Sequence, residues 1–584
     1  MIPVRAYFRL LVDYLRPMRG RVALLSAVLL TSIGLQLLNP QIVRVFLDRV
    51  TEGAGQEELI PLALWFMGIA VVHQVLTVYS TYLAEDIGWT ATNEMRARLA
   101  NHLLHLDMGF HKSTTPGELI ERIDGDVTAL SNFFSAFMIR VVGNGVLLTG
   151  VLVLLWRENV WVGLGLTVFS LLALAVMVRL QIVAVPWWKD VRGTSAELMG
   201  FIGEQLSGTE DIRANGGERY MMWRFTEILR GWLPQQVRGR MGFALMWTTG
   251  IGVYIFGTVL VFWLGSLLYG AGTLTLGSVY LIFYYSEMSR HPMEQIRSQM
   301  EDFQKAGAGI ERVQSLFDRT SALTWNGEHH LPAGALRVTF DGVEFSYDDV
   351  AGNDRVLHGV SFDLAPGRVM GVLGRSGSGK TTLARLLTRL YDPQHGRIML
   401  GGVDAHDVDP EELRRRVGMV TQDVQLFRAP VRDNLTFFDG NGHGDAPLLE
   451  VIERLGLSEW LAALDDGLDT ELESGGGGLS AGQAQLLAFT RIFLRDPGVV
   501  ILDEASSRLD PATEVLIERA VDRLLDGRTG IIIAHRLATV NRADDILIME
   551  DGRVVEYGER QQLAADPNSR LSHLLKTGIE EVLA

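Results

Sequence analysis

Eight consecutive residues in the second half of the chain have the types and the spacing needed to hold a phosphate group. They read Gly374-Arg375-Ser376-Gly377-Ser378-Gly379-Lys380-Thr381, followed by Thr382. Glycines let backbone N–H groups turn toward phosphate oxygens. A lysine at this position can reach the outer two phosphates of a nucleoside triphosphate, and the threonine hydroxyl can bind Mg²⁺. The loop therefore predicts a triphosphate site with contacts from Gly374, Ser376, Gly377, Ser378, Gly379, Lys380, Thr381 and Thr382; the alternative is a chance match in a glycine-rich chain.

A second group of residues could complete phosphoryl-transfer chemistry. The apolar run 499–502 ends in Asp503 and Glu504. Phosphoryl transfer depends mostly on positioning and charge neutralisation, so an acid beside the metal and an acid beside water suffice. We expect Asp503 to bind Mg²⁺ and Glu504 to orient the attacking water. Taken alone, the pair could also be two surface acids at a strand end.

The elements that must position these residues are those of an α/β domain. The apolar run 369–373 predicts a strand directly before the phosphate loop, and 382–390 predicts a helix directly after it, whose N-terminus favours anions. From Leu336 onward, short apolar runs alternate with amphipathic helices, which is typical of a largely parallel sheet. We place this domain at 336–584, a linker at 318–335, and a different kind of domain at 1–317.

The first 317 residues are too apolar for a soluble domain. The chain of 584 residues is 48% hydrophobic, and the excess lies almost entirely before residue 300. Each apolar segment there is long enough to cross a hydrocarbon core of about 30 Å, and a polar backbone can do so only as a helix. The sequence predicts an all-α domain of six transmembrane helices near 21–46, 58–84, 131–156, 159–184, 242–269 and 274–298. Buried soluble helices are the alternative.

The distribution of cations predicts the orientation. Arg16, Arg19 and Arg21 precede the first segment, and most other cations of this half follow segments two and four. By the positive-inside tendency, the N-terminus lies in the cytoplasm, and an even number of crossings returns the chain there. We expect a multi-pass protein of the inner or plasma membrane. Residues 4–16 predict an amphipathic surface helix, or else a helix packed on protein. The inner connections 85–130 and 185–241 predict long helical extensions with a short crossing helix at each tip.

Charge and cysteine content argue against two functions, and a few polar residues lie within the apolar segments. The net charge of −16 argues against nucleic-acid binding, and the absence of cysteine excludes disulfides and thiolate chemistry. Arg140, Glu287 and His291 lie within the apolar segments, where charges are either functional or paired for structural reasons. A further group could line an apolar substrate cavity or simply pack: Trp247, Tyr254, Tyr284, Tyr285 and Met288.

More motifs follow in a fixed order along the α/β half. They are Tyr347 in Phe345-Ser346-Tyr347, Gln422 in Val420-Thr421-Gln422-Asp423, the run Leu479-Ser480-Ala481-Gly482-Gln483, Ser507-Arg508-Leu509-Asp510, and His535 in Ile533-Ala534-His535-Arg536. With the phosphate loop and the paired acids, this set resembles the ATP-binding cassette of an ABC exporter half-transporter of the six-helix, domain-swapped type. The resemblance covers nearly the whole chain, and the tips near 110–117 and 207–214 look like its coupling helices.

The resemblance implies specific roles. Two cassettes close head to tail around two ATP molecules, so a second chain, the same or homologous, is required. Tyr347 would stack on adenine, while Ser480, Gly482 and Gln483 would reach the ATP held by the partner. Gln422 would contact Mg²⁺ or water, and His535 the γ-phosphate. Three departures from the family pattern leave their effects open: Ala481, Arg508 and the run Gly475-Gly476-Gly477-Gly478.

The expected function is ATP-driven export of an amphiphilic substrate, such as a drug or a lipid, by alternating access. Two alternatives stay open: an importer that uses the same fold, as in siderophore uptake, and a regulatory half that binds ATP and leaves hydrolysis to its partner. The sequence leaves the substrate, the direction of transport and the identity of the partner chain undecided.

Overall fold

The computed structural model describes residues 14–577, apart from 326, 348–354, 422–423, 440–443, 478, 504–510 and 535–539. The chain forms two compact units. The first comprises Met1–Leu104 and Pro116–Arg319, and the second comprises His105–Thr115 and Thr320–Ala584. The second unit therefore contains a short piece of the chain that precedes most of the helical half.

In the residues that the structure describes, the regular secondary structure of the first unit is all helical. Its long helices are α2 (Arg19–Thr51), α3 (Gln56–Leu104), α7 (Asn144–Glu158), α8 (Val160–Ser207), α10 (Glu218–Gly270) and α11 (Leu276–Phe317). Shorter pieces are η1 (Arg16–Met18), α5 (Pro116–Ile120), the π-helical η2 (Glu121–Asp126), α6 (Val127–Ala136), the π-helical η3 (Phe137–Gly143) and α9 (Thr209–Ala214). At 1.5 Å per residue, a helix such as α3 is about 70 Å long, more than twice a hydrocarbon core.

Among the described residues, five helices are long and apolar enough to cross a membrane. Each overlaps one of the first five predicted segments, but the third span, Ile139–Glu158, begins later than the predicted 131–156. The sixth predicted segment does form a helix, α11, but it is not among the five. The reason is its composition, since its N-terminal half carries tyrosines together with Glu287, Arg290 and His291. This helix packs against α2, α7 and α10, so it lies among other helices of the bundle.

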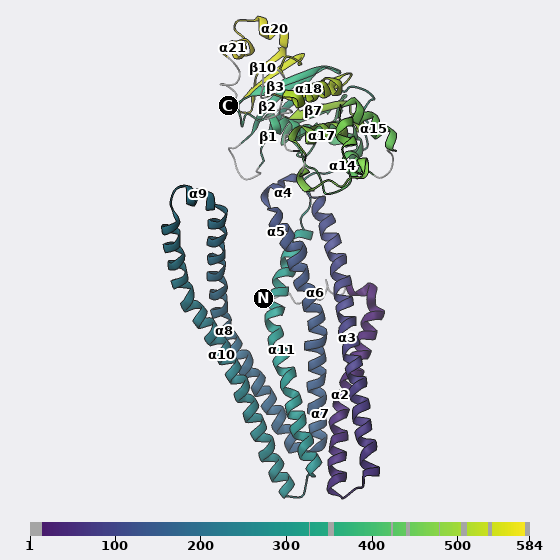
Figure 1. The fold of residues 1–584 in the computed structure, drawn as a ribbon, viewed down its shortest axis with the longest axis vertical. Helices are drawn as coiled ribbons and strands as arrows, with labels where there is room; N and C mark the ends of the chain where they lie inside the picture. Colours follow the sequence, from purple (N-terminus) through teal and green to yellow (C-terminus); the bar gives the residue numbers. More distant parts are fainter. Residues whose placement is uncertain are drawn as a thin grey trace. The chain divides into compact units, whose positions relative to one another are not determined.

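The helices of the first unit pack as neighbouring pairs (Figure 1). α2 lies beside α3, and α8 lies beside α10 along much of their length. The α8–α10 pair diverges from the other helices toward the end that carries α9. At the opposite end, an apolar cluster joins α2, α7, α8, α10 and α11. Its members include Ile33, Val151, Val162, Val261 and Tyr285, one from each of these helices.

The second unit is built around two sheets. The six-stranded sheet has the order β10-β9-β3-β8-β7-β6 and is parallel except for β10. Its strands are β3 (Val369–Gly374), β6 (Val417–Val420), β7 (Val499–Asp503), β8 (Thr529–Ile533), β9 (Asp545–Glu550) and β10 (Arg553–Glu559). The antiparallel sheet β2-β1-β4-β5 contains β1 (Val338–Phe345), β2 (Leu357–Leu364), β4 (His395–Leu400) and β5 (Val403–Asp404). The predicted α/β class is confirmed.

Helices cover these sheets. They are α12 (Lys380–Leu387), α13 (Pro410–Arg416), α14 (Val431–Thr436), α15 (Asp445–Arg454), α16 (Ser458–Ala462), α17 (Ala481–Arg495), α18 (Pro511–Leu525), α20 (Arg560–Ala565) and α21 (Arg570–Thr577). Every residue of β3, β7 and β8 is buried, as expected of central parallel strands. One further helix of this unit, α4 (Met108–Ser113), comes from the first predicted cytoplasmic tip.

Candidate functional site

The predicted phosphate loop joins β3 to α12. Gly374, the last residue of β3, has φ 153°, and a Cβ there would lie 2.3 Å from the carbonyl oxygen of Met549. Gly379, directly before α12, has φ 100°, and a Cβ there would lie 2.6 Å from Leu357 Cδ2. Only glycine fits both the backbone conformation and the space. The loop thus follows a path on which backbone N–H groups can approach a ligand closely.

Two buried polar side chains occupy this loop. Lys380 is 5% exposed, and its Nζ donates to the carbonyl oxygens of Gly374 at 2.6 Å and Arg375 at 3.0 Å. Ser378 is 4% exposed, and its buried Oγ has no hydrogen-bond partner among the described residues. The unsatisfied hydroxyl, beside a buried ammonium, calls for a polar partner. The oxygens of a phosphate group fit that need. Arg375, Ser376 and Gly377 are exposed at the loop's outer rim.

The predicted metal ligands come from neighbouring parts of the same sheet. Thr381 is partly buried in the first turn of α12, and Asp503 is 5% exposed at the end of β7. β8 separates β3 from β7, and Ile533 of β8 is paired with both Val372 and Asp503. α12 packs against β3 and β7. In parallel strands the carboxyl ends share one sheet edge, so loop and carboxylate belong to the same edge.

These residues fit the way Mg²⁺ is held beside a nucleotide. Within the described part of the chain, no group of three or more His, Asp or Glu side chains gathers into a metal cage. Mg²⁺ usually keeps several waters and takes only one or two protein ligands beside substrate phosphates. A threonine hydroxyl and one carboxylate are therefore an adequate set for magnesium bound together with a triphosphate.

Tyr347 lies next to the phosphate loop. Its Oη is 3.0 Å from Thr382 Oγ1 and accepts a hydrogen bond from Arg385 Nη1 at 3.0 Å. Its ring also meets Phe345 and Tyr391 at nearly right angles, with centroids 4.9 and 5.1 Å away. Burial raises the pKa of Tyr391. Tyr347 is thus an aromatic ring fixed against α12, as a ring that stacks on a base has to be.

The helix α4, part of the first predicted tip, contacts this aromatic group. Lys112 Nζ lies 4.2 Å from the ring centroid of Tyr347, a cation–π geometry. At the start of α4, Asp107 accepts hydrogen bonds from the backbone N–H groups of Phe110 and Ala322. Partial burial works to raise the pKa of Asp107, but these backbone donors outweigh it and hold the pKa below its ordinary value. Sequence reasoning missed the contact between Lys112 and Tyr347, because no motif signals it.

The predicted signature residues form a helix N-terminus. Ser480 is the N-cap of α17, where its Oγ accepts from Gln483 N at 3.2 Å while its own N–H donates to Gln483 Oε1 at 2.9 Å. This reciprocal capping box commits the Gln483 side chain to the helix end. Gly482 is buried, and Ala481 is exposed at the first helical position, so its extra methyl group meets no crowding. The N-terminus of a 15-residue helix favours anions.

The unusual glycine run before Ser480 has a local structural explanation. Gly475 and Gly476 have φ 74° and 79°, values that favour glycine. Gly475 N–H donates to the carbonyl oxygen of Leu426 at 3.0 Å, and a Cβ on Gly476 would lie 3.1 Å from the Leu426 side chain. These glycines therefore let the chain pack closely on the segment that follows Gln422. Gly477 lies in a turn, and Gly478 lies outside the described residues.

Arg491 of α17 holds the segment 425–434, which follows Gln422, by hydrogen bonds. Its guanidinium donates to the carbonyl oxygens of Asn434 at 2.7 Å and Gln425 at 3.0 Å. Burial, followed by the charge of Arg495, lowers the pKa of Arg491 to about 10. The segment 425–434 is consequently fixed to the helix that begins at Ser480.

Other predicted site residues lie outside the described part of the chain. They are Gln422, Glu504, His535 and the group Ser507, Arg508, Leu509 and Asp510, as is most of the predicted amphipathic helix 4–16. The strands that end just before two of them are described: β7 ends at Asp503, and β8 ends at Ile533.

The polar residues predicted within the membrane half have varied surroundings. Glu287 lies 3.7 Å from Arg290 on its own helix, and Arg290 lies 4.7 Å from the ring of Tyr254. Arg140 and His291 are exposed, and Tyr284 is exposed as well. Tyr285 is fully buried and bonds to Gln41 and to the carbonyl oxygen of Leu37, so its role there is packing between helices. Trp247 lines a cavity of about 160 Å³, and Met288 packs on the apolar cluster.

The fold and the loop together define a membrane protein that carries its own nucleotide-binding domain. Comparison with known families agrees. Residues 22–292 match the ABC transporter transmembrane region, and residues 357–507 match the ABC transporter domain.

Relatives extend the match over the whole chain. The cyclolysin secretion/processing ATP-binding protein of Bordetella pertussis is 31% identical over 93% of this chain and 76% of that protein. The ATP-dependent lipid A-core flippase of Haemophilus ducreyi is 28% identical over 93% of this chain and 92% of that protein. An ATP-bound structure of a bacterial Atm1-family ABC exporter is 25% identical, covers 96% of this chain and 98% of that one, and has a TM-score of 0.78.

The chain belongs to the ABC transporter family. Within it, the fusion of one transmembrane region to one ATP-binding domain makes it an exporter-type half-transporter, whose ATP hydrolysis is coupled to transport. The resemblance inferred from the motifs is thereby confirmed.

Proposed function

We propose that two such chains form a transporter that exports an amphiphilic substrate, a drug or a lipid, from an inner or plasma membrane, with the ATP-binding units in the cytoplasm. The main observation that supports ATP binding is the structure of the buried phosphate loop. Lys380 and the unsatisfied hydroxyl of Ser378 gather beside glycines that leave no room for a Cβ. The apolar helices and the relationship to a lipid A-core flippase support the amphiphilic substrate.

The residues of this chain would divide the chemistry among them. Lys380 and the N–H groups from Gly374 to Thr382 hold the phosphates, while Tyr347 holds the adenine ring. Thr381, Asp503 and Gln422 would hold Mg²⁺, which screens the phosphate charge when it is bound. Glu504 orients the attacking water, and His535 contacts the γ-phosphate. A helix N-terminus and fixed donors of this kind stabilise the charge that moves during phosphoryl transfer.

The second chain, the same or homologous, supplies the opposite face of each ATP site. Ser480 and Gly482 stand at the N-terminus of α17, so this end of the helix can point its positive pole at a phosphate. Gln483, also predicted as a contact, would act by holding Ser480 in the capping box. ATP that binds the closed pair better than the open pair shifts the equilibrium toward closure. The tip helices α4 and α9 then carry that change to the substrate path.

A Glu504→Gln variant of the purified chain, reconstituted in lipid vesicles, tests the ATP chemistry. We expect it to bind ATP as the unaltered chain does and to hydrolyse it at least about a hundredfold more slowly, a loss in the range for a positioned catalytic group. Asp496→Asn, a change at an exposed acid outside the site, is the matched control. Unaltered turnover in Glu504→Gln would refute the role of this carboxylate.

Two further measurements separate the remaining alternatives. The ATPase rate of this chain purified alone distinguishes a self-sufficient pair from a regulatory half that depends on a different partner. The direction of flux of a fluorescent lipid in vesicles of known orientation distinguishes export from import. Uptake toward the ATP-binding side would overturn the proposed direction and leave the ATP site intact.

A further inference from the structure

A large cavity lies in the helical unit, outside the nucleotide site. It measures about 890 Å³, within the range of small-ligand sites, and is formed by the C-terminal half of α2, the end of α7 and the start of α11. Helix α7 leads into α8 at this end, while α9 stands at the other end of α8. The cavity therefore lies at the end of the bundle remote from the tip carrying α9.

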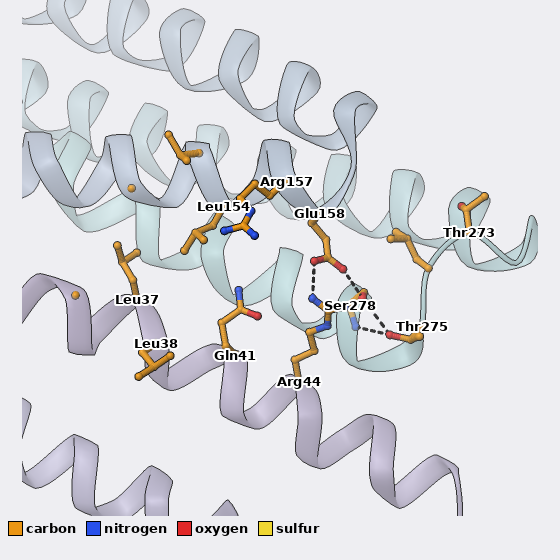
Figure 2. Close-up of a pocket in the computed structure, with 14 residues that line it drawn as sticks. Leu37, Leu38, Gln41, Arg44, Leu154, Arg157, Glu158, Thr273, Thr275 and Ser278 are labelled. Carbon is orange, nitrogen blue, oxygen red and sulfur yellow. Dashed lines mark hydrogen bonds and ion pairs between the residues drawn. The ribbon is translucent and has the colours of Figure 1, made fainter.

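One side of the cavity is charged, but its carboxylate is already neutralised. Glu158 accepts a hydrogen bond from Arg44 Nη1 at 2.6 Å and another from the hydroxyl of Ser278. Its side chain is 12% exposed, and Arg44 also faces Asp48 at 3.8 Å. Figure 2 shows this linked group along the α2 and α11 sides of the cavity. With these partners satisfied, Glu158 offers little attraction for a cation.

Arg157 is the charge that remains. It is exposed and makes no hydrogen bond or ion pair with any residue that the structure describes. Figure 2 shows its guanidinium turned toward the amide of Gln41 across the cavity. The Gln41 amide nitrogen is bonded to Tyr285, which holds that side chain in place. A guanidinium presents five donors in a planar fork that matches carboxylate and phosphate oxygens.

The other walls are apolar. Leu37, Leu38, Val153, Leu154 and Leu274 line them. Leu38 and Val153 stay 47% and 53% exposed. Gly34 adds open space, because nothing lies within 4 Å of a Cβ built there. A small free anion would leave these walls uncovered, whereas a molecule with an anionic head and a hydrocarbon tail would satisfy both sides.

We propose that this cavity binds the anionic headgroup of an amphiphile, a phosphate or carboxylate, through Arg157, with its hydrocarbon part along Leu38 and Val153. The proposal deepens the proposed function, on which it rests for the amphiphilic substrate, by specifying the charge of the head. It also identifies a site at the end of the bundle remote from α9, where an exported molecule would be held before release.

Binding to the full chain in detergent, without nucleotide, tests the site. The probes are dihexanoyl phosphatidic acid, dihexanoyl phosphatidylcholine and inorganic phosphate, measured by calorimetry. We expect the phosphatidic acid to bind at least about tenfold more tightly than the other two, since only this probe combines a net anionic head for Arg157 with hydrocarbon chains for the apolar walls. Equal binding of phosphatidylcholine would overturn the charge requirement. Inorganic phosphate that binds equally tightly, in a component that Arg157→Gln removes and that is therefore not the nucleotide site, would overturn the role of the apolar walls.

Variants tie the binding to the cavity. Arg157→Gln should weaken phosphatidic acid binding by about tenfold, while Arg157→Lys, which keeps the charge but loses the planar fork, should bind with an affinity between those of the unaltered chain and Arg157→Gln. Gly34→Leu, which fills open space, should weaken it independently of charge. Arg49→Gln at the end of α2 is the matched control, because Arg49 faces Glu58 at 3.5 Å and does not line the cavity.

The outcomes also separate this inference from the proposed function. Arg157 ends a helix, where a cation is favourable for stability alone, so thermal unfolding of Arg157→Gln is measured in parallel. Unaltered phosphatidic acid binding by Arg157→Gln and Gly34→Leu, in a chain that still hydrolyses ATP, would overturn the site and leave the transporter proposal standing. Loss of ATP hydrolysis in the unaltered chain would count against the transporter proposal instead.

Discussion

Replacing Lys112 by glutamine is expected to tighten ATP binding. The Lys112 ammonium lies 4.2 Å from the centre of the Tyr347 ring, within the distance at which a cation is attracted to an aromatic face. If adenine stacks on that same face, it must first displace the lysine. Breaking the cation–π contact then reduces the net free energy of ATP binding. Without the lysine there is no contact to break, so ATP binds more tightly.

The size of the effect follows from exposure. Lys112 is exposed and Tyr347 is partly buried. An exposed cation–π contact contributes about 0.5–1 kcal/mol, which corresponds to roughly a two- to fivefold change in affinity. We therefore expect the dissociation constant for a non-hydrolysable ATP analogue to fall by about that factor in Lys112→Gln.

The assay is calorimetric titration of the purified chain with the analogue and Mg²⁺. Lys576→Gln on α21 is the matched control, because it removes an exposed lysine far along the chain from the aromatic group. Lys112→Arg, which keeps a cation, should bind like the unaltered chain. Weaker binding in Lys112→Gln would refute the competition argument, since it would mean that the lysine supports the bound base. Identical binding in all variants would show that adenine uses another face.

Three other predictions follow from the ATP-binding unit. Gly374→Ala should abolish measurable ATP binding, because its Cβ would lie 2.3 Å from the carbonyl oxygen of Met549. Gly377→Ala has φ 82° but no atom within 4 Å of the added Cβ, so it should cost only about 1–2 kcal/mol of stability. Equal effects of the two variants in thermal unfolding and ATP titration would contradict this. Arg491→Met should destabilise the unit by about 2–4 kcal/mol through loss of three charged hydrogen bonds, against less than about 1 kcal/mol for the exposed Arg495→Gln, as measured by denaturant unfolding. The pKa of Asp107 is lower in the folded chain than in the unfolded chain, so the stability that its carboxylate contributes is fully present above the unfolded pKa of about 3.9 and is lost as the pH falls through the folded pKa. Amide hydrogen exchange at Ala322, whose N–H donates to Asp107, should accelerate over that pH range. Asp107→Asn should remove this pH dependence.

The sequence predicted those parts of the fold that depend on residues close together in the chain. The phosphate loop was recognisable because strand, glycine turn, lysine and helix are contiguous in the chain. The apolar helices were recognisable because lipid demands long apolar segments. Helix α11 forms as predicted, but its tyrosines, Glu287, Arg290 and His291 make it less apolar than the other long helices. Its packing against α2, α7 and α10 depends on the arrangement of the bundle, which the local sequence does not show.

Other features depend on contacts between distant residues. Nothing local to Gly475 and Gly476 shows that they pack on Leu426, so the sequence left that run unexplained. Arg157 likewise looks like an ordinary cation at a helix end until α2 and α11 complete a cavity around it. The roles of Glu504, Gln422 and His535 stay predictions from the motif order.

The position of α4 suggests how nucleotide binding is communicated along the chain. Residues His105–Thr115 belong to the ATP-binding unit, and α3 ends at Leu104, one residue earlier. Asp107 fixes the start of α4 to Ala322, and Lys112 places its end on Tyr347. Any base that displaces Lys112 therefore acts on a six-residue helix that is covalently continuous with α3. Because α3 is a single helix of 49 residues, a shift at α4 can be carried along it toward the membrane-spanning part of the bundle.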